Sequence, residues 1–249
     1  RNNMTALDIL SINPKRMRVG IDLSTVTPEQ LNISKGRYDQ LVRRGSIAHK
    51  YGGSLYLSQY VEYKDILPRP KWIYVEGANH TGISADLVID DISYLLGFYI
   101  GDGWVNGNRL NFAVEKSFVV DFLKRIEESI KIKVHPTIRD MGKGSVEIRC
   151  ACHPLVEFIN FYFGKKKCYE KNIPAEFLFG NRCSQLQLIE GMIDSDGSRN
   201  RGVDDISRNR FPCSYTTSSS MLKDDLCLLL RALNVSYTVA KRDPSLGGI

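Results

Sequence analysis

The fold of this chain is decided by two short segments, LLGFYIGDG at residues 95–103 and IEGMIDSDG at residues 189–197. Each is a helix-like run that ends in Asp-Gly and has two small residues four positions apart, on one helical face. A glycine inside a helix costs about 1 kcal/mol relative to alanine, and close approach of a second backbone is the simplest reason to keep it. The pattern predicts two helices packed through their small faces. Asp102 and Asp196 would then lie together and could hold a hard divalent cation.

The two segments resemble the paired motifs of LAGLIDADG homing endonucleases in their single-chain, two-repeat form. The first segment keeps four of the nine letters and the second keeps five. The downstream sequence also matches within the chain, because Ser117 begins an apolar-periodic helix and Ser220, 103 residues later, begins another. The chain therefore contains a long-period duplication. The alternative interpretation of either segment is a buried helix that ends at a glycine C-cap.

The resemblance implies an α+β fold in which two pseudo-symmetric αββαββα repeats form a saddle of antiparallel sheets. We expect a winged-helix module at residues 1–67, a linker at 68–87 with one possible strand at Trp72–Val75, and an endonuclease domain at 88–249. Repeat one would cover residues 88–182, and repeat two, which is incomplete, residues 183–249. Within repeat one we expect strands near 109–114, 134–139 and 145–149, and helices near 117–130 and 154–163.

The same resemblance implies a site-specific DNA endonuclease that hydrolyses phosphodiester bonds of a long duplex target. Its partner would be double-stranded DNA, and it would act as a monomer with internal pseudo-two-fold symmetry. Asp102 and Asp196 would bind Mg²⁺ or Mn²⁺, with Ca²⁺ as a non-catalytic substitute. The carbonyl oxygens of Gly101 and Ser195 would complete the metal shell.

Enzymes of this family also use a lysine near the metal site to polarise the attacking water or to balance charge. The candidates are Lys167 and Lys171, of which we favour Lys167. The alternative for the whole lysine cluster is phosphate contact without catalysis. Asp194 is a weaker candidate ligand, because the corresponding residue of the first segment is Ile100.

A second function class is a cleavage-inactive protein with the LAGLIDADG fold that binds DNA or RNA, such as a transcription regulator or an intron maturase. Loss of one of the two motif carboxylates would favour this class. Both carboxylates are present, so the nuclease is the preferred interpretation.

Residues 1–67 do not match the repeats and resemble the small winged helix-turn-helix of excisionase and MerR-type proteins. The matching residues are Leu31–Ser34, Leu41–Gly45 and Gly52–Gly53. We expect a helix that Ser34 caps and that enters a major groove, followed by a hairpin at Gly52–Gly53 that touches phosphates. The basic side chains on this helix are Lys35, Arg37, Arg43 and Arg44. The alternative is a docking module whose basic face is simply solvated.

Composition agrees with a nucleic-acid partner without identifying it. The 249 residues have a formal net charge of +6. The six cysteines form no spaced CxxC pairs, so reduced thiols are expected. No apolar run is long enough to span a membrane and no signal peptide is visible, so we expect a bacterial, phage or archaeal cytoplasm, or an organelle, rather than secretion. Further basic residues expected to contact DNA are Arg109, Arg139, Lys143, Arg149, Lys165, Lys166, Arg199 and Arg201.

Overall fold

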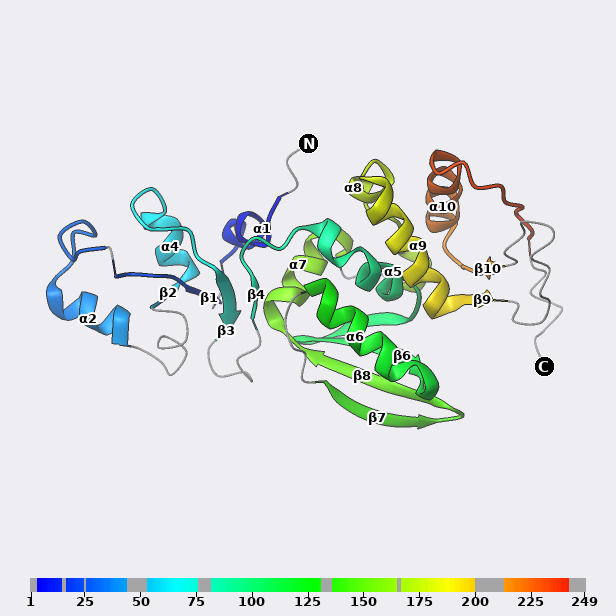
Figure 1. The fold of residues 1–249 in the computed structure, drawn as a ribbon, viewed down its shortest axis with the longest axis horizontal. Coiled ribbons are helices and arrows are strands. Elements are labelled where there is room, and N and C mark those ends of the chain that lie inside the picture. Colours follow the sequence, from blue (N-terminus) through cyan, green and yellow to red (C-terminus); the bar gives the residue numbers. More distant parts are fainter. Residues whose placement is uncertain are drawn as a thin grey trace.

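The computed structural model has an α+β fold, in which an N-terminal sheet unit precedes a domain built around one pair of long helices (Figure 1). The described residues are 4–14, 17–24, 26–43, 53–75, 82–130, 136–164, 167–199 and 213–241. Within them, no helix has both the length and the apolar character needed to cross a membrane.

The N-terminal unit is a four-stranded antiparallel sheet with the strand order β2-β1-β3-β4. Two of these strands come from residues 68–87: β3 has the bounds predicted for a strand inside the expected linker, Trp72–Val75, whereas β4 was not predicted. The stretch Trp72–Val75 is apolar or aromatic at every position and buries the adjacent residues Ile73 and Tyr74, whose side chains point to opposite faces of the sheet. The elements are α1 (Ala6–Ile12), β1 (Met17–Gly20), α2 (Lys35–Arg43), β2 (Ser54–Tyr56), α4 (Leu57–Tyr63), β3 (Trp72–Val75) and β4 (Ile83–Ser84).

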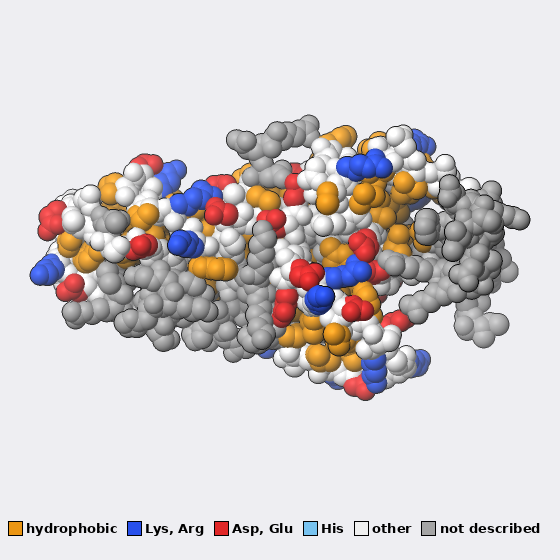
Figure 2. Space-filling view, in the orientation of Figure 1, with side chains coloured by type: hydrophobic (Ala, Val, Ile, Leu, Met, Phe, Trp, Pro, Cys, Tyr) orange, Lys and Arg blue, Asp and Glu red, His pale blue; other side chains and the backbone are white. Residues whose placement is uncertain are grey.

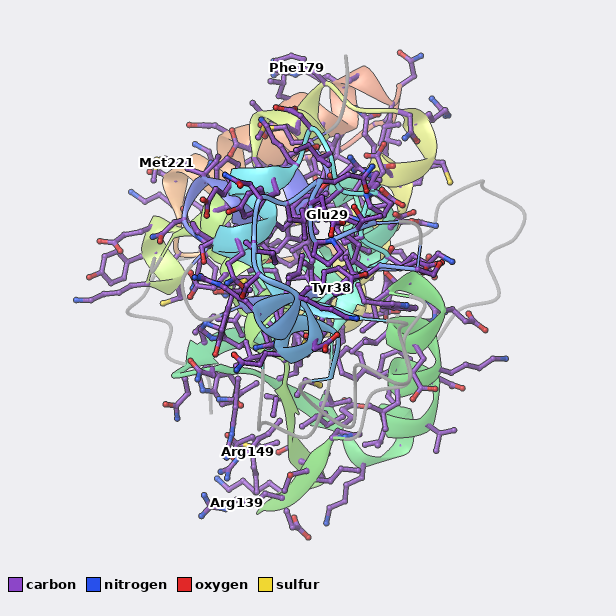
Figure 3. All side chains as sticks on the ribbon, turned by 90° about the vertical axis from the view of Figure 1, so that its left-hand side faces the viewer. Glu29, Tyr38, Arg139, Arg149, Phe179 and Met221 are labelled. Atoms are coloured by element: carbon purple, nitrogen blue, oxygen red, sulfur yellow. The ribbon has the colours of Figure 1, made fainter. Side chains whose placement is uncertain are left out.

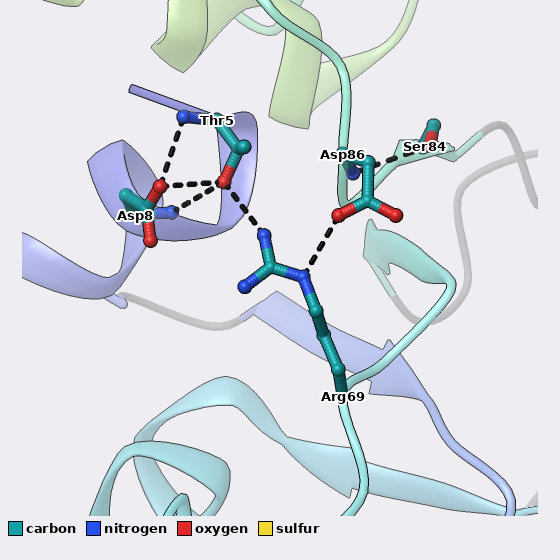
Figure 4. A network of polar contacts seen from close by, with 5 residues as sticks. All are labelled: Thr5, Asp8, Arg69, Ser84 and Asp86. Carbon is teal, nitrogen blue, oxygen red and sulfur yellow. Dashed lines mark hydrogen bonds and ion pairs between the residues drawn. The ribbon is translucent and has the colours of Figure 1, made fainter. Parts of the chain in front are cut away.

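Polar contacts tie the beginning of the chain to the end of this sheet (Figure 4). Thr5 and Asp8 cap α1 through a reciprocal pair of hydrogen bonds. The Arg69 guanidinium bonds to the Asp86 carboxylate at 2.8 Å and to Thr5 Oγ1 at 3.1 Å. The backbone N–H of Ala6 also donates to the carbonyl of Leu87 at 2.7 Å. The unit therefore extends to residue 87 instead of ending at residue 67.

Helix α2 forms where the helix-turn-helix resemblance predicts it. Ser34 Oγ accepts a hydrogen bond from the N–H of Arg37 at 3.3 Å, as expected for the cap. The hydroxyl of Tyr38, labelled with Glu29 in Figure 3, lies within hydrogen-bond distance of the carbonyls of Val26 at 2.7 Å and Leu23 at 2.9 Å, shares its one proton between them and anchors the helix. Residues 28–32 form a turn in place of a full first helix. The expected hairpin residues up to Gly52 lie outside the described residues.

Repeat one follows the expected αββαββα order. Its sheet has the antiparallel order β5-β6-β8-β7, and Phe98, Phe112 and Phe122 form an aromatic core between the sheet and two of its helices. The elements are η1 (Ile89–Ile92), α5 (Ser93–Asp102), β5 (Gly103–Asn106), β6 (Arg109–Glu115), η2 (Lys116–Phe118), α6 (Val119–Ile130), β7 (Thr137–Gly142), β8 (Ser145–Ala151) and α7 (His153–Phe163).

Repeat two reproduces the first four elements of repeat one. The pairing of Gly197 with Tyr215 matches the pairing of Gly103 with Phe112, so both motif helices run into equivalent hairpins. Residues 235–241 are described and contain no strand. The elements from the connection onward are η3 (Cys168–Glu170), α8 (Ala175–Leu178), α9 (Arg182–Asp196), β9 (Gly197–Arg199), β10 (Cys213–Tyr215) and α10 (Ser220–Ala232).

Candidate active site at the helix pair

Helices α5 and α9 pack directly on each other through their small residues, as predicted (Figure 1). A Cβ atom added to Gly97 would overlap the carbonyl oxygen of Leu188, and one added to Gly191 would overlap that of Tyr94. A Cβ on Gly101 would overlap the Ser195 hydroxyl. The obstructing atoms at Gly97 and Gly191 are backbone atoms, so these two glycines set the distance between the helices.

Both helices end at the glycine that follows the motif aspartate. The N–H of Gly103 donates to the carbonyl of Tyr99, and the N–H of Gly197 donates to that of Ile193. Both glycines have negative φ angles, so a left-handed backbone conformation is not the reason for glycine at these positions. Close packing is the reason. A Cβ on Gly103 would lie 2.5 Å from the Cα of Tyr99. Asp102 is thus the last residue of α5, just as Asp196 ends α9.

The pKa values of both motif carboxylates are raised, and for Asp102 the charge of the other carboxylate contributes. Burial, followed by the nearby charge of Asp196, raises the pKa of Asp102 to about 6, and the Lys171 ammonium opposes the shift. Burial also raises the pKa of Asp196, and Lys171 again opposes the shift. Asp102 is half-buried and Asp196 is exposed, and a bound cation would stabilise the ionised form of a carboxylate that burial and a second carboxylate disfavour.

Lys171 comes from the connection between the repeats and reaches the end of α5. Its Nζ donates to the carbonyl oxygens of Tyr99 at 2.8 Å, Ile100 at 2.9 Å and Gly103 at 2.9 Å, with a longer contact of 3.4 Å to Gly101. These carbonyls form the negative end of the helix dipole, which a cation stabilises. Burial lowers the pKa of Lys171 to about 8, although the charges of Asp196, Cys168 and Asp102 favour the ammonium form.

Lys167 has different surroundings. Its side chain is exposed, and its ammonium lies 5.7 Å from the centre of the Tyr169 ring. The geometry therefore favours Lys171 over Lys167 as the lysine of the carboxylate pair. The Gly101 carbonyl, a predicted metal ligand, faces the Lys171 ammonium. Ser195 donates its hydroxyl to the carbonyl of Met192 at 2.9 Å, and the metal role of its own carbonyl stays a prediction.

Asp194 belongs to a separate polar cluster on another side of α9. Its carboxylate accepts hydrogen bonds from the Tyr94 hydroxyl at 3.0 Å and from Arg125 at 3.4 Å. Arg125 also pairs with Glu190 at 2.5 Å and lies over the Tyr94 ring. These contacts join α5, α6 and α9. Asp194 therefore holds three helices together and has partners other than the motif aspartates.

Tyr215 is a residue that the sequence interpretation missed. It stands 103 residues after Phe112, at the equivalent register position beside the glycine that follows the motif aspartate. Burial and then the charges of Asp196 and Asp102 raise the pKa of Tyr215. The charges of both motif carboxylates thus act on a phenol in repeat two, where the equivalent residue of repeat one is Phe112. The constant offset of the duplication was the signal that could have revealed it.

Three of the predicted DNA contacts share one face of the repeat-one sheet. Arg149 on β8 is paired with Asn111 on one side and Thr137 on the other, while Arg139 is paired with Glu147. Arg109 lies two residues from Asn111 on the same strand, so its side chain emerges on this face too. The opposite face carries the buried residues Leu110, Phe112, Val114, Val146, Ile148 and Cys150.

This sheet face also contains an acidic side chain. Glu147 is buried and pairs with Arg149 at 2.5 Å, which holds the guanidinium in place. Figure 3 labels Arg139 and Arg149, which lie near each other beside β7 and β8. On the face of the molecule in Figure 2, by contrast, acidic and basic side chains are interspersed. The arginines of this sheet face are therefore the best-placed candidates for phosphate or base contact.

The remaining predicted contacts have mixed outcomes. Lys35 and Arg37 are exposed on α2, and Lys143 lies in the β7–β8 turn with a φ of +51°. Arg43 ends α2 and Arg199 lies in β9, but their side chains are outside the described residues, as are Arg44, Lys165, Lys166 and Arg201 altogether.

All six cysteines are free, and burial raises the pKa of the Cys150 and Cys152 thiols to about 12.

The donor atoms at the carboxylate pair suit a hard divalent cation. Carboxylate and carbonyl oxygens are the ligands that Mg²⁺ prefers, and Mg²⁺ is often bound by one or two carboxylates together with water and substrate phosphates. Among the described residues, no group of three His, Cys, Asp or Glu side chains could hold a metal ion. Asp102 and Asp196 therefore fit a cation whose shell is completed by backbone, water or substrate oxygens.

Comparison with known sequences shows distant similarity over most of the chain, and no protein-family model matches it. An uncharacterized protein of Methanocaldococcus jannaschii is 24% identical over 217 residues, which cover 78% of this chain and 24% of that protein. Protein RecA of Mycobacterium tuberculosis is 28% identical over 169 residues, covering 62% of this chain and 20% of RecA. The chain thus spans less than a quarter of the length of these curated relatives.

Comparison with solved structures gives weak superpositions. A complex of an I-DmoI variant with its target DNA, nicked in the coding strand and with manganese present, has a TM-score of 0.43 at 17% identity and covers 64% of this chain and 84% of that one. The homing endonuclease I-WcaI bound to its DNA recognition sequence has a TM-score of 0.38 at 15% identity, with coverage of 59% and 67%. At such scores the superpositions assign no function.

Proposed function

We propose that this chain is a site-specific DNA endonuclease of the LAGLIDADG type, which hydrolyses phosphodiester bonds in a long duplex target with the help of a divalent metal ion. The observation that carries the proposal is the carboxylate pair of Asp102 and Asp196 at the ends of two glycine-packed helices, next to the buried Lys171 ammonium. A pair of this kind concentrates negative charge that only a cation or a proton relieves.

The roles of the residues follow from their positions. Asp102 and Asp196 would hold the metal ion, with backbone oxygens such as those of Gly101 and Ser195 as further ligands. A bound divalent cation activates a water molecule and neutralises charge on the leaving oxygen of a phosphodiester. Lys171 would act through its positive charge, balancing the negative charge at the scissile phosphate, because its three N–H donors are taken by the carbonyls of Tyr99, Ile100 and Gly103. Its burial at the α5 terminus holds the ammonium in one position before substrate arrives.

The DNA would lie on the sheet face that contains Arg109, Arg139 and Arg149. Side chains that alternate along strands can reach base edges in the major groove, where each base pair has a distinct pattern of donors and acceptors. Both motif helices belong to one chain, so the active unit would be a monomer with internal pseudo-symmetry. The exposed Lys35 and Arg37 on α2 would add phosphate contacts outside the central site.

The test begins with selection, from a randomised duplex library in Ca²⁺, of the duplexes that the wild-type protein binds, and the cleavage assays that follow contain Mg²⁺. Cleavage and gel-shift affinity are then measured for the wild-type protein, Asp102→Asn and Asp196→Asn on a selected target. We expect either variant to lose double-strand cleavage by at least about 100-fold while binding changes little. Asp194→Asn serves as the matched control, because this carboxylate has its own partners. Specific binding without any cleavage by the wild-type protein would instead support the cleavage-inactive class.

A further inference from the structure

The position of Lys171 depends on contacts made by its backbone as well as by its ammonium. The residue lies in an extended stretch between η3 and α8 that is itself neither helix nor strand. A lysine side chain has about 2 kcal/mol of rotamer entropy to lose, so its ammonium is placed well only if its main chain is fixed. The structure shows what fixes it: the beginning of α10, which belongs to repeat two.

The first contact comes from Ser219, which precedes α10. Its Oγ donates to the carbonyl oxygen of Lys171 at 2.6 Å and accepts from the N–H of Leu222 at 3.2 Å. The bond from the Leu222 N–H uses a lone pair of the Ser219 oxygen and leaves the hydroxyl proton unused. That single proton is therefore available for the bond to the Lys171 carbonyl. Ser219 is 1% exposed and Lys171 is 6% exposed, so water cannot readily replace this bond.

The second contact comes from Asp225, further along α10. Its Oδ2 accepts a hydrogen bond from the N–H of Ile173 at 2.8 Å. Ile173 is itself 1% exposed and so anchors the segment in the core. Two hydrogen bonds from one rigid helix, made to positions two residues apart, fix both the place and the direction of the Lys171 main chain.

We propose that Ser219 and Asp225 are positioning residues that fix Lys171 next to the motif carboxylates. Through these two residues α10, the helix that follows the motif hairpin of repeat two, sets the position of the Lys171 ammonium at the end of α5 in repeat one. This inference rests on the proposed nuclease function and adds to it a dependence of the Asp102 end of the site on repeat two. Neither residue touches substrate. Each acts through the Lys171 main chain.

The positioning role differs from a purely structural one in its coupling to Lys171. A misplacement of about 1 Å in a catalytic group can cost roughly 100-fold in rate. Ser219→Ala should therefore lower the single-turnover cleavage rate at saturating DNA and Mg²⁺ by about 10- to 100-fold, with the DNA dissociation constant changed less than about 3-fold. Asp225→Ala should act in the same direction. Ser219→Thr and Asp225→Asn keep the hydroxyl and an acceptor oxygen, so each should restore most of the rate.

The decisive measurement is a double-mutant cycle with Lys171→Met in the full chain. If Ser219 acts through Lys171, Ser219→Ala should cause little further loss in the Lys171→Met background. Thr5→Ala is the matched control, because it removes another helix-cap hydroxyl in the N-terminal unit (Figure 4), and it should leave the rate unchanged. Circular dichroism and melting temperature, measured on every variant, separate misfolding from misplacement, and the Thr and Asn variants cover the case in which an alanine variant fails to fold.

Two results would overturn the inference. One is an equal loss of rate from Ser219→Ala in the wild-type and Lys171→Met backgrounds. The other is an unchanged rate in both Ser219→Ala and Asp225→Ala. A wild-type protein that binds its selected DNA but never cuts it would reject the proposed function itself, and the positioning role with it. That outcome is visible before any variant is made.

Discussion

Replacement of Gly97 by alanine is the sharpest test of the helix pair. Alanine is the better helix former by about 1 kcal/mol, so propensity alone predicts a more stable protein. The new Cβ would overlap the Leu188 carbonyl oxygen and would also lie 2.9 Å from its carbon and 3.0 Å from the Met192 nitrogen. All three are backbone atoms of α9, which cannot rotate away.

The two opposing effects can be compared in magnitude. Overpacking typically costs about 1–3 kcal/mol, and rigid backbone neighbours favour the upper part of that range. After subtraction of the propensity gain, Gly97→Ala should destabilise the protein by about 1–2 kcal/mol, which corresponds to a fall in melting temperature of roughly 2–8 °C for a chain of this size. Differential scanning calorimetry of the metal-free protein would measure it.

The chain supplies a matched control for this test. Gly36 lies within α2, is exposed, and has no atom within 4 Å of the position that a Cβ would take. Gly36→Ala should therefore stabilise its unit by roughly 0.5–1 kcal/mol, opposite in sign to Gly97→Ala. If Gly97→Ala raised the melting temperature as Gly36→Ala should, the close approach of α5 and α9 would be refuted.

Three other predictions address the site. In EDTA, Asp102→Asn should stabilise the protein at pH 8 by roughly 1 kcal/mol after allowance for solvent screening, and by much less at pH 4, because the penalty of a carboxyl whose pKa rises on folding from 3.8 to about 6 grows between those two pKa values and is complete above them; destabilisation at pH 8 would contradict the raised pKa of Asp102. Lys171→Met should lower the single-turnover cleavage rate by about 100-fold or more, whereas Lys167→Met should change it by less than about 3-fold, and the reverse order would restore Lys167 as the catalytic lysine. Arg149→Ala should reduce the slope of log affinity against log salt by about 0.9, as loss of one phosphate contact requires; an unchanged slope would remove Arg149 from the DNA interface.

Much of the repeat domain could be predicted because local signals and the fold agree there. Gly97 and Gly191 have no local reason to lie inside helices, so they indicate a tertiary contact, and the structure has that contact. The helix and strands of repeat one follow simple apolar periodicities that the antiparallel sheet preserves.

The choice between Lys167 and Lys171 could not be made from sequence. Both belong to one basic stretch, and only the contacts of the folded chain show that Lys171 turns inward to the α5 carbonyls. Tyr215 was missed for a related reason, since its closeness to the carboxylates arises from strand register. The strand at Trp72–Val75 could be predicted from sequence, but its place in a sheet could not, because its partner β1 lies more than fifty residues earlier in the chain.

The strand order of the N-terminal sheet has a consequence for any dissection of this protein. Strand β1 lies between β2 and β3, so a cut after residue 67 would separate β1 from β3 and leave the hydrogen-bonding groups of Trp72–Val75 unpaired along one side. An uncovered strand edge is a template for pairing with another molecule. A truncated protein that starts at residue 68 would thus be prone to self-association, and its weaker DNA binding could be mistaken for the loss of a DNA-binding module. A cut that removes residues 1–87 as one piece avoids that confusion.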